Sequence, residues 1–199
     1  FAAKWLLPRI ERFQAAWPET DLRLDTSLKP VDFVAQRIDV GVRYGRGQWP
    51  GLAAEKLMDE EVYPVCAPAL LTTATLQAPG DLRGQVLIHD QSVDTSTGLA
   101  SWQAWLRHAG VQGVPTDRGL RINNSAAVLQ AAIDGQGVAL ARSVMAHDDL
   151  AAGRLVRLFP QVRLESALAY YVVYRPECIA QPKVAAFRDW LLREAHGPA

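Results

Sequence analysis

Polar side chains that could hold a small molecule stand between a predicted strand and a predicted helix in the second half of the chain. Asn124 and Ser125 follow a strand expected over residues 119–122 and open a helix expected over 125–134. The free N–H groups of a helix start, together with the helix dipole, form a natural site for a carboxylate or a phosphate. Capping of the helix by either side chain accounts for the same residues, and the two roles are compatible. Arg142 follows the next predicted strand, where it could clamp a carboxylate or form a surface ion pair.

Other polar residues stand at the ends of two predicted strands in the first half of the chain. Thr26 and Ser27 follow the first of these strands, and Arg43 and Tyr44 end the second. Ligands of open α/β sheets bind at the carboxyl ends of the strands. We therefore expect these four side chains to line a ligand-binding cleft.

The best candidate for catalysis is the adjacent pair His89 and Asp90, at the end of a buried strand over 86–88. Neighbours on an extended strand point to opposite faces, so the two side chains would not form a dyad. His89 then either makes a hydrogen bond at the strand end or lines the cleft. The sequence has no GxSxG elbow, no HExxH and no GxxxxGK[ST] motif, so we expect neither an enzyme nor a cofactor.

The predicted elements alternate between helices and strands, which favours an α/β fold with parallel strands. A helix over 2–17 precedes a strand over 21–25, a helix over 30–37 and a strand over 38–44. A unit of this type usually begins with a strand, so we expect a first strand upstream of this chain. A second α/β set follows, with strands over 86–88, 119–122, 137–141 and 155–156, helices over 99–109, 125–134 and 143–153, and a closing helix from Pro182.

Two long extended stretches, over 56–67 and 168–174, join the two α/β sets. This arrangement predicts two lobes linked by a pair of strands. Ligands usually bind in the cleft between such lobes. We assign residues 1–62 and 172–199 to the first lobe and residues 63–171 to the second.

Composition restricts the partners of this chain. Its 21 Lys and Arg residues balance 21 Asp and Glu residues, whereas nucleic-acid binding relies on a basic excess, so DNA would have to be bound by another segment. No apolar run approaches the roughly 20 residues that cross a bilayer, and no membrane partner is expected. Cys66 and Cys178 have no metal-ligand spacing and are expected as reduced, half-buried thiols of a cytoplasmic protein, with a disulfide as the alternative.

Several joined motifs resemble one family of bacterial regulators. The opening FAAKWLLPRIERF looks like the first helix of the effector domains of LysR-type transcriptional regulators. DLRL and IDVGVRYGRGQWPGL resemble the branch that contains the glycine-cleavage and β-lactamase-gene activators. The same branch has, in the same order and spacing, counterparts of PVCAPALL, PGDLRG, SWQAWL, AAIDGQGVALAR, GRLVRLFP and KVAAFRDWLL.

The resemblance implies a type-II periplasmic-binding-protein-like fold, with two Rossmann-like lobes joined by two crossover strands. It also implies an N-terminal winged helix-turn-helix, outside this chain, that binds DNA. The effector domains of the family form homodimers or tetramers, with the first helix of one copy packed against its partner. The family's ligand pocket draws on the first helix, the second-lobe helix start and the returning strand, which correspond here to Phe1, Ala2, Asn124, Ser125 and Tyr171 or its neighbour Tyr170.

The first hypothesis is therefore an effector-sensing domain. A small polar or anionic effector would bind between the lobes and modulate DNA binding by the missing domain. A periplasmic solute-binding protein of the same fold is the alternative, and a signal peptide upstream in place of a helix-turn-helix would distinguish it. A small-molecule enzyme would rest on His89 and Asp90 alone.

Overall fold

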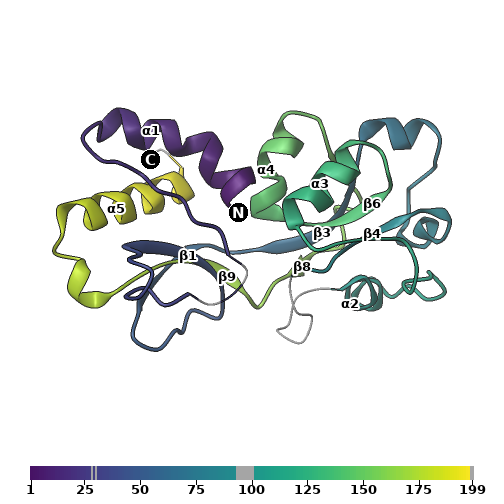
Figure 1. Cartoon of the computed structure of the whole chain (residues 1–199). Coiled ribbons are helices and arrows are strands. Elements are labelled where there is room, and N and C mark those ends of the chain that lie inside the picture. The colour runs from purple at the N-terminus through teal and green to yellow at the C-terminus, as the bar shows by residue number, and fades with distance from the viewer. Residues whose placement is uncertain (28, 30, 93–100, 198–199) are drawn as a thin grey trace. The chain divides into compact units, whose positions relative to one another are not determined.

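The computed structural model describes residues 1–27, 29, 31–92 and 101–197 of an α/β protein (Figure 1). The chain divides into two compact units. The central unit comprises Glu61–Ser166 with Phe1 and Ala3–Trp5, and the terminal unit comprises Leu6–Glu60 and Ala167–Ala199 with Ala2. The chain thus passes between the units after Glu60 and after Ser166, whereas the sequence placed the lobe boundaries after residues 62 and 171.

The sheet of the terminal unit has three strands in the order β1-β9-β2. β9 (Ala169–Tyr174) comes from the far end of the chain and pairs antiparallel with both β1 (Val40–Gly45) and β2 (Ala53–Met58). The expectation of parallel strands is wrong for this unit, because its central strand is a return segment and not the product of a crossover helix.

Two expected elements of the terminal unit are not formed. Residues 21–25 belong to no sheet, and both Leu22 and Leu24 are exposed. A strand needs a neighbour for its N–H and C=O groups, and none of the described strands pairs with this segment. In place of a helix over 30–37 there is a turn, in which Asp32 accepts hydrogen bonds from the N–H groups of Val34 and Ala35. Pro30, the expected start of that helix, lies outside the described residues.

The long helix expected over residues 2–17 is broken into three short pieces. A π-helical turn over Ala2–Leu6 leads into a 3-10 turn over Leu7–Arg9, and only α1 (Ile10–Ala16) is α-helical. Pro8 explains the interruption, because it has no N–H to donate to the preceding turn. α1 lies beside α5 (Pro182–His196), as Figure 1 shows, and the rings of buried Phe13 and Phe187 are perpendicular with centroids 4.9 Å apart.

The central unit has a six-stranded sheet. Its main order is β5-β4-β6-β3-β7, and β8 pairs with β3. β4 (Leu87–Asp90) is parallel to both β5 (Leu120–Ile122) and β6 (Val138–Arg142), as predicted. The antiparallel strands are β3 (Glu61–Cys66), β7 (Val156–Arg157) and β8 (Leu164–Glu165). The carboxyl ends of β4, β5 and β6 therefore meet at one edge of the sheet.

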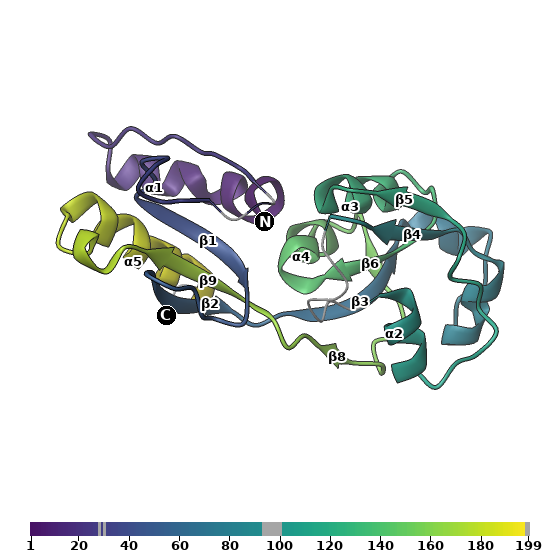
Figure 2. The ribbon, with the colours of Figure 1, turned by 60° about the horizontal axis from the view of Figure 1, so that its bottom comes forward.

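Helices cover both faces of this sheet. Figures 1 and 2 show α3 (Ser125–Ile133) and α4 (Ser143–Ala151) on one face and α2 (Trp102–His108) on the other. Trp102 and Trp105 of α2 are buried, and the Trp102 indole N–H donates to the carbonyl of Ile88 in β4. These two tryptophans are core residues. The expected start of α2 at residues 99–100 lies outside the described residues.

Both cysteines are free thiols, as predicted, but they are fully buried and not half-buried. Burial raises the pKa of the Cys66 thiol to about 11, so this group stays protonated at neutral pH. No group of residues able to hold a metal ion exists within the described parts of the chain.

The start of β6 depends on a glycine. Gly137 has a φ of +155°, and a Cβ atom there would lie 2.3 Å from the carbonyl oxygen of Val86. We expect Gly137→Ala to lower the free energy of unfolding by about 3 kcal/mol, because that clash is with backbone. Urea denaturation measures the loss. Gly84→Ala is the matched control, since a Cβ at Gly84 meets nothing within 4 Å. Equal stability of the two variants would contradict the expectation.

Candidate ligand-binding site

Four polar side chains meet at the sheet edge where β4 and β6 end and α3 begins. The carboxylate of Asp90 accepts hydrogen bonds from the hydroxyl of Ser92 at 2.5 Å and from the hydroxyl of Ser125 at 2.5 Å. It also accepts the backbone N–H of Ser92 at 2.8 Å. The guanidinium of Arg142 donates to the oxygen of Ser125 at 2.5 Å. We call Asp90, Ser92, Ser125 and Arg142 the polar cluster.

The hydroxyl groups of the polar cluster are oriented by the charged groups. The two serine oxygens lie 2.8 Å apart, but each hydroxyl has a single hydrogen and both can donate to Asp90. When both do so, the oxygen of Ser125 is left as the acceptor for Arg142. The cluster therefore joins a carboxylate to a guanidinium through one hydroxyl group.

Of the two roles that the sequence left open at the start of α3, the structure shows the capping of the helix. Asn124 caps the helix, since its side-chain oxygen accepts the N–H of Ala127 at 3.0 Å. Ser125, the first residue of α3, turns its hydroxyl into the polar cluster instead. Asn124 thus fixes the helix start, and Ser125 supplies a polar group at that end of the sheet.

A very small cavity lies against the polar cluster. Its volume is about 10 Å³, and its lining combines Asp90, Ser125 and Arg142 with the apolar residues Val128, Leu129, Leu140, Ala141 and Met145. That volume holds about one water molecule. This surface of the central unit can therefore receive small charged or hydrogen-bonding groups, but not the bulk of a larger ligand.

The structure separates the neighbours His89 and Asp90, as the alternation of a strand requires. The Nε2 atom of His89 lies 2.9 Å from the carbonyl oxygen of Arg118, in the segment before β5, whereas Asp90 belongs to the polar cluster. Of the two readings left open for His89, the geometry shows the hydrogen bond at the strand end. Sequence reasoning missed Asp90 and Ser92 as site residues. The available signal was the position of Asp90 at the carboxyl end of a strand.

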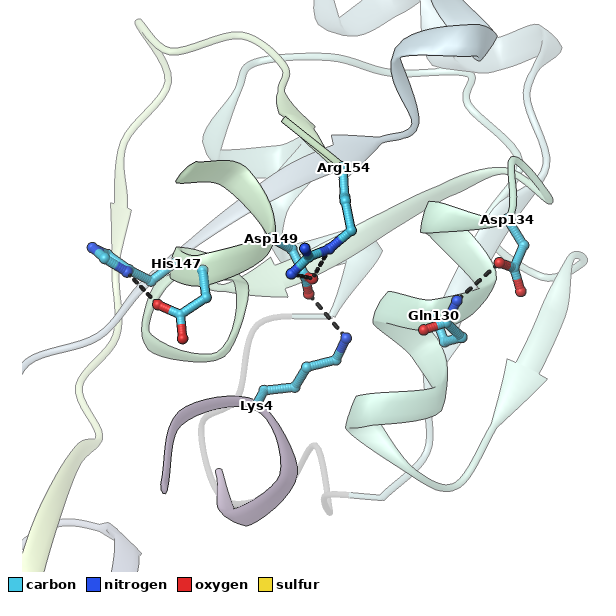
Figure 3. A network of polar contacts seen from close by, with 7 residues as sticks. Lys4, Gln130, Asp134, His147, Asp149 and Arg154 are labelled. Atoms are coloured by element: carbon cyan, nitrogen blue, oxygen red, sulfur yellow. Dashed lines mark hydrogen bonds and ion pairs between the residues drawn. The ribbon is translucent and has the colours of Figure 1, made fainter. Parts of the chain in front are cut away.

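The opening residues of the chain are tied to the helix that follows Arg142. The ring of Phe1 stacks on buried Trp5 with centroids 5.0 Å apart. Lys4 forms an ion pair of 3.0 Å with Asp149 of α4, a carboxylate that is only 3% exposed and also accepts from Arg154 (Figure 3). Ala2 is grouped with the terminal unit and not with these residues.

In the terminal unit, Arg43 is held by its own surroundings. It donates to the carbonyl of Val31 at 3.1 Å, and its guanidinium lies 5.3 Å from the Phe33 ring and 5.8 Å from the Trp49 ring. Burial lowers the pKa of Arg43 below its usual value. The rings of Trp49 and Tyr171 also lie with their centroids 5.5 Å apart, so Arg43 and Tyr171 share this aromatic neighbour.

The other predicted residues of the terminal unit are not gathered with Arg43. Tyr44 contacts Tyr170 with ring centroids 4.8 Å apart, so Tyr170 and Tyr171 have different ring partners, as alternation along β9 predicts. Thr26 and Ser27 are exposed, and the Ser27 hydroxyl bonds to the backbone of Lys29.

The comparisons with known proteins identify the family. The model of the LysR substrate binding domain matches residues 1–196. The chain belongs to this family. The glycine cleavage system transcriptional activator of Escherichia coli K12 is 43% identical over 196 residues, which are 98% of this chain and 62% of that protein. The chain thus spans less than two thirds of that relative's length.

Solved structures of the same family share the fold. The effector domain of the transcriptional regulator AmpR of Pseudomonas aeruginosa matches with a TM-score of 0.78 and 33% identity, covering 98% of this chain and 91% of that chain. The AmpR effector binding domain from Citrobacter freundii gives 0.79 and 26%, covering 98% and 94%. These matches confirm the type-II periplasmic-binding-protein-like fold. The relatives are transcriptional regulators and not enzymes, and they do not favour the periplasmic solute-binding alternative.

None of the described helices is both long and apolar enough to cross a membrane.

The contact between Lys4 and Asp149 can be tested by mutation. We expect Asp149→Asn to lower the free energy of unfolding by about 2 kcal/mol. The substitution removes the buried negative charge that forms ion pairs with both Lys4 and Arg154. The cost stays moderate because Lys4 and Arg154 reach solvent. Asp134→Asn, at an exposed carboxylate that accepts from Gln130, should change stability by less than about 0.5 kcal/mol. Thermal denaturation measures both. A loss no larger at Asp149 than at Asp134 would contradict this role.

Proposed function

We propose that this chain is the effector-sensing domain of a bacterial LysR-type transcriptional regulator. The observation that carries the proposal is the family match over residues 1–196, together with the 43% identity to a transcriptional activator. The effector is a small polar molecule. Its charged groups bind at the polar cluster, where Ser125 and Arg142 stand at the carboxyl ends of parallel strands.

DNA binding belongs to an N-terminal helix-turn-helix domain outside residues 1–199. The balanced charge of this chain supports that division of labour. The effector acts by population shift: it binds one conformation more tightly and so changes how the DNA-binding domains are held. The protein works in the cytoplasm, where its DNA is.

The active form is a homodimer or a tetramer. Among the described residues of the terminal unit, four apolar side chains in its first part are each more than a third exposed: Leu7, Trp17, Leu22 and Leu24. Apolar surface of this kind supports contact with a second copy of the chain.

The proposal is tested on the full-length regulator. We expect it to bind the promoter beside its own gene, and an effector found by a thermal-shift screen of amino acids, organic acids and muropeptides to change that binding. Ser125→Ala should weaken effector binding at least about tenfold, because it removes the hydroxyl group that lies between Asp90 and Arg142. DNA binding without effector should stay unchanged. Thr72→Ala, at an exposed hydroxyl bonded to Ala69, is the control.

Failure of the full-length protein to bind that promoter would overturn the regulatory role. If Ser125→Ala and Thr72→Ala respond equally to the effector, the polar cluster does not bind it.

A further inference from the structure

Among the residues that the structure describes, the carboxylate of Asp90 accepts hydrogen bonds from neutral donors only. Its three hydrogen bonds come from the N–H and hydroxyl of Ser92 and from the hydroxyl of Ser125. Among the described residues no lysine, arginine or histidine forms an ion pair with it. Asp90 therefore brings a negative charge to the polar cluster without a cation in direct contact.

The positive charge of the cluster lies one hydroxyl group away. Arg142 donates to the same oxygen of Ser125 whose hydrogen points to Asp90. A simple anion that approached Arg142 would also meet the carboxylate of Asp90, and like charges at this separation repel. A simple cation at Asp90 would meet Arg142 in the same way. Neither kind of ligand suits a site that presents both charges side by side.

We propose that the effector is a zwitterion, a free α-amino acid, whose ammonium group binds Asp90 and whose carboxylate binds at Ser125 and Arg142. This inference rests on the proposed function and names the class of effector. An α-amino acid carries its two charges on one carbon, which matches a carboxylate and a guanidinium joined through a single hydroxyl. Asp90 is then the residue that distinguishes an amino acid from a plain carboxylic acid.

The cavity beside the cluster supports recognition through the charged groups. Because the cavity has room for about one water molecule, it can hold an ammonium group or one carboxylate oxygen of the ligand. It is too small for an amino-acid side chain. The side chain of the amino acid therefore points away from the cluster. The central unit then selects the class of ligand, and the choice among amino acids is made by other residues.

Calorimetry with matched compounds tests this on the wild-type domain. Each of the twenty amino acids is titrated, and each binder is compared with the acid lacking its amino group and the amine lacking its carboxylate, such as alanine with propionate and ethylamine. We expect at least one amino acid to bind and both partial compounds to bind at least tenfold more weakly. Absence of binding by every amino acid, or equal binding of the plain acid, overturns the proposal.

A conservative variant isolates the charge of Asp90. Asp90→Asn keeps an oxygen that can accept the N–H of Ser92, so the turn after β4 is retained and the melting temperature reports any misfolding. We expect the amino acid to bind at least tenfold more weakly and the plain acid to bind as well as before or better. Asp134→Asn is the control for removing a carboxylate elsewhere in the unit. Unchanged amino-acid binding in Asp90→Asn overturns the proposal.

The outcome also separates this inference from the proposed function. Binding of a dicarboxylate or another non-zwitterion that is lost in Ser125→Ala would refute the amino-acid class and leave the effector-sensing role intact. A regulator that responds to an amino acid equally well in Asp90→Asn would refute this inference and leave the effector-sensing role intact.

Discussion

The parallel pairing of β4 with β6 is the constraint on which the site depends. Leu87 pairs with Val138 and Ile88 with Ala139, so two strands about fifty residues apart end at the same edge of the sheet. That register places Asp90 and Arg142 on either side of the start of α3, where Ser125 joins them. Burial of the strands between α2 and α3 holds the register, because a one-residue slip would exchange the side chains packed against α3 with those packed against α2.

The same strand connects the site to the start of the chain. β6 ends at Arg142, and α4 follows without a linker and carries Asp149. Asp149 holds Lys4, two residues after the opening dipeptide. In the proposed function, a ligand that binds Arg142 contacts the residue directly before a helix that is bonded to the start of the chain. The proposed route from the effector to DNA binding consists of one strand end, one helix and one ion pair.

The sequence predicts the central unit well and the terminal unit less well, for a physical reason. In the central unit, local signals agree with the tertiary structure: short buried strands, the cap at Asn124 and the glycines around Gly137 mark where its strands and helices begin and end. In the terminal unit, β1 pairs with β9, some 130 residues away, and the local sequence of β1 does not predict an antiparallel partner. The break at Pro8 was visible in the sequence, but the apolar spacing around it favoured one continuous helix.

The site could be predicted in part. The rule that ligands bind at strand carboxyl ends located Ser125 and Arg142, and the alternation of a strand separated His89 from Asp90. Alternation cannot tell which of two faces meets α3, so it gave no reason to choose Asp90 over His89. The orientation of the Ser92 and Ser125 hydroxyls depends on atoms from three separate segments, and no sequence pattern encodes it.

The central claim is that the effector binds at the sheet edge formed by β4, β6 and α3. The alternative binding site is a larger cavity of about 360 Å³, which is lined by α2, residues 110–114 and Thr116. The most direct measurement is a nuclear magnetic resonance titration of the isotope-labelled domain with the amino acid that binds best. The account predicts that the amide signals of Ser92, Ser125 and Arg142 move most. Amide changes concentrated at Gln103, Arg107, residues 110–114 and Thr116, with the signals of the polar cluster unmoved, would contradict the account.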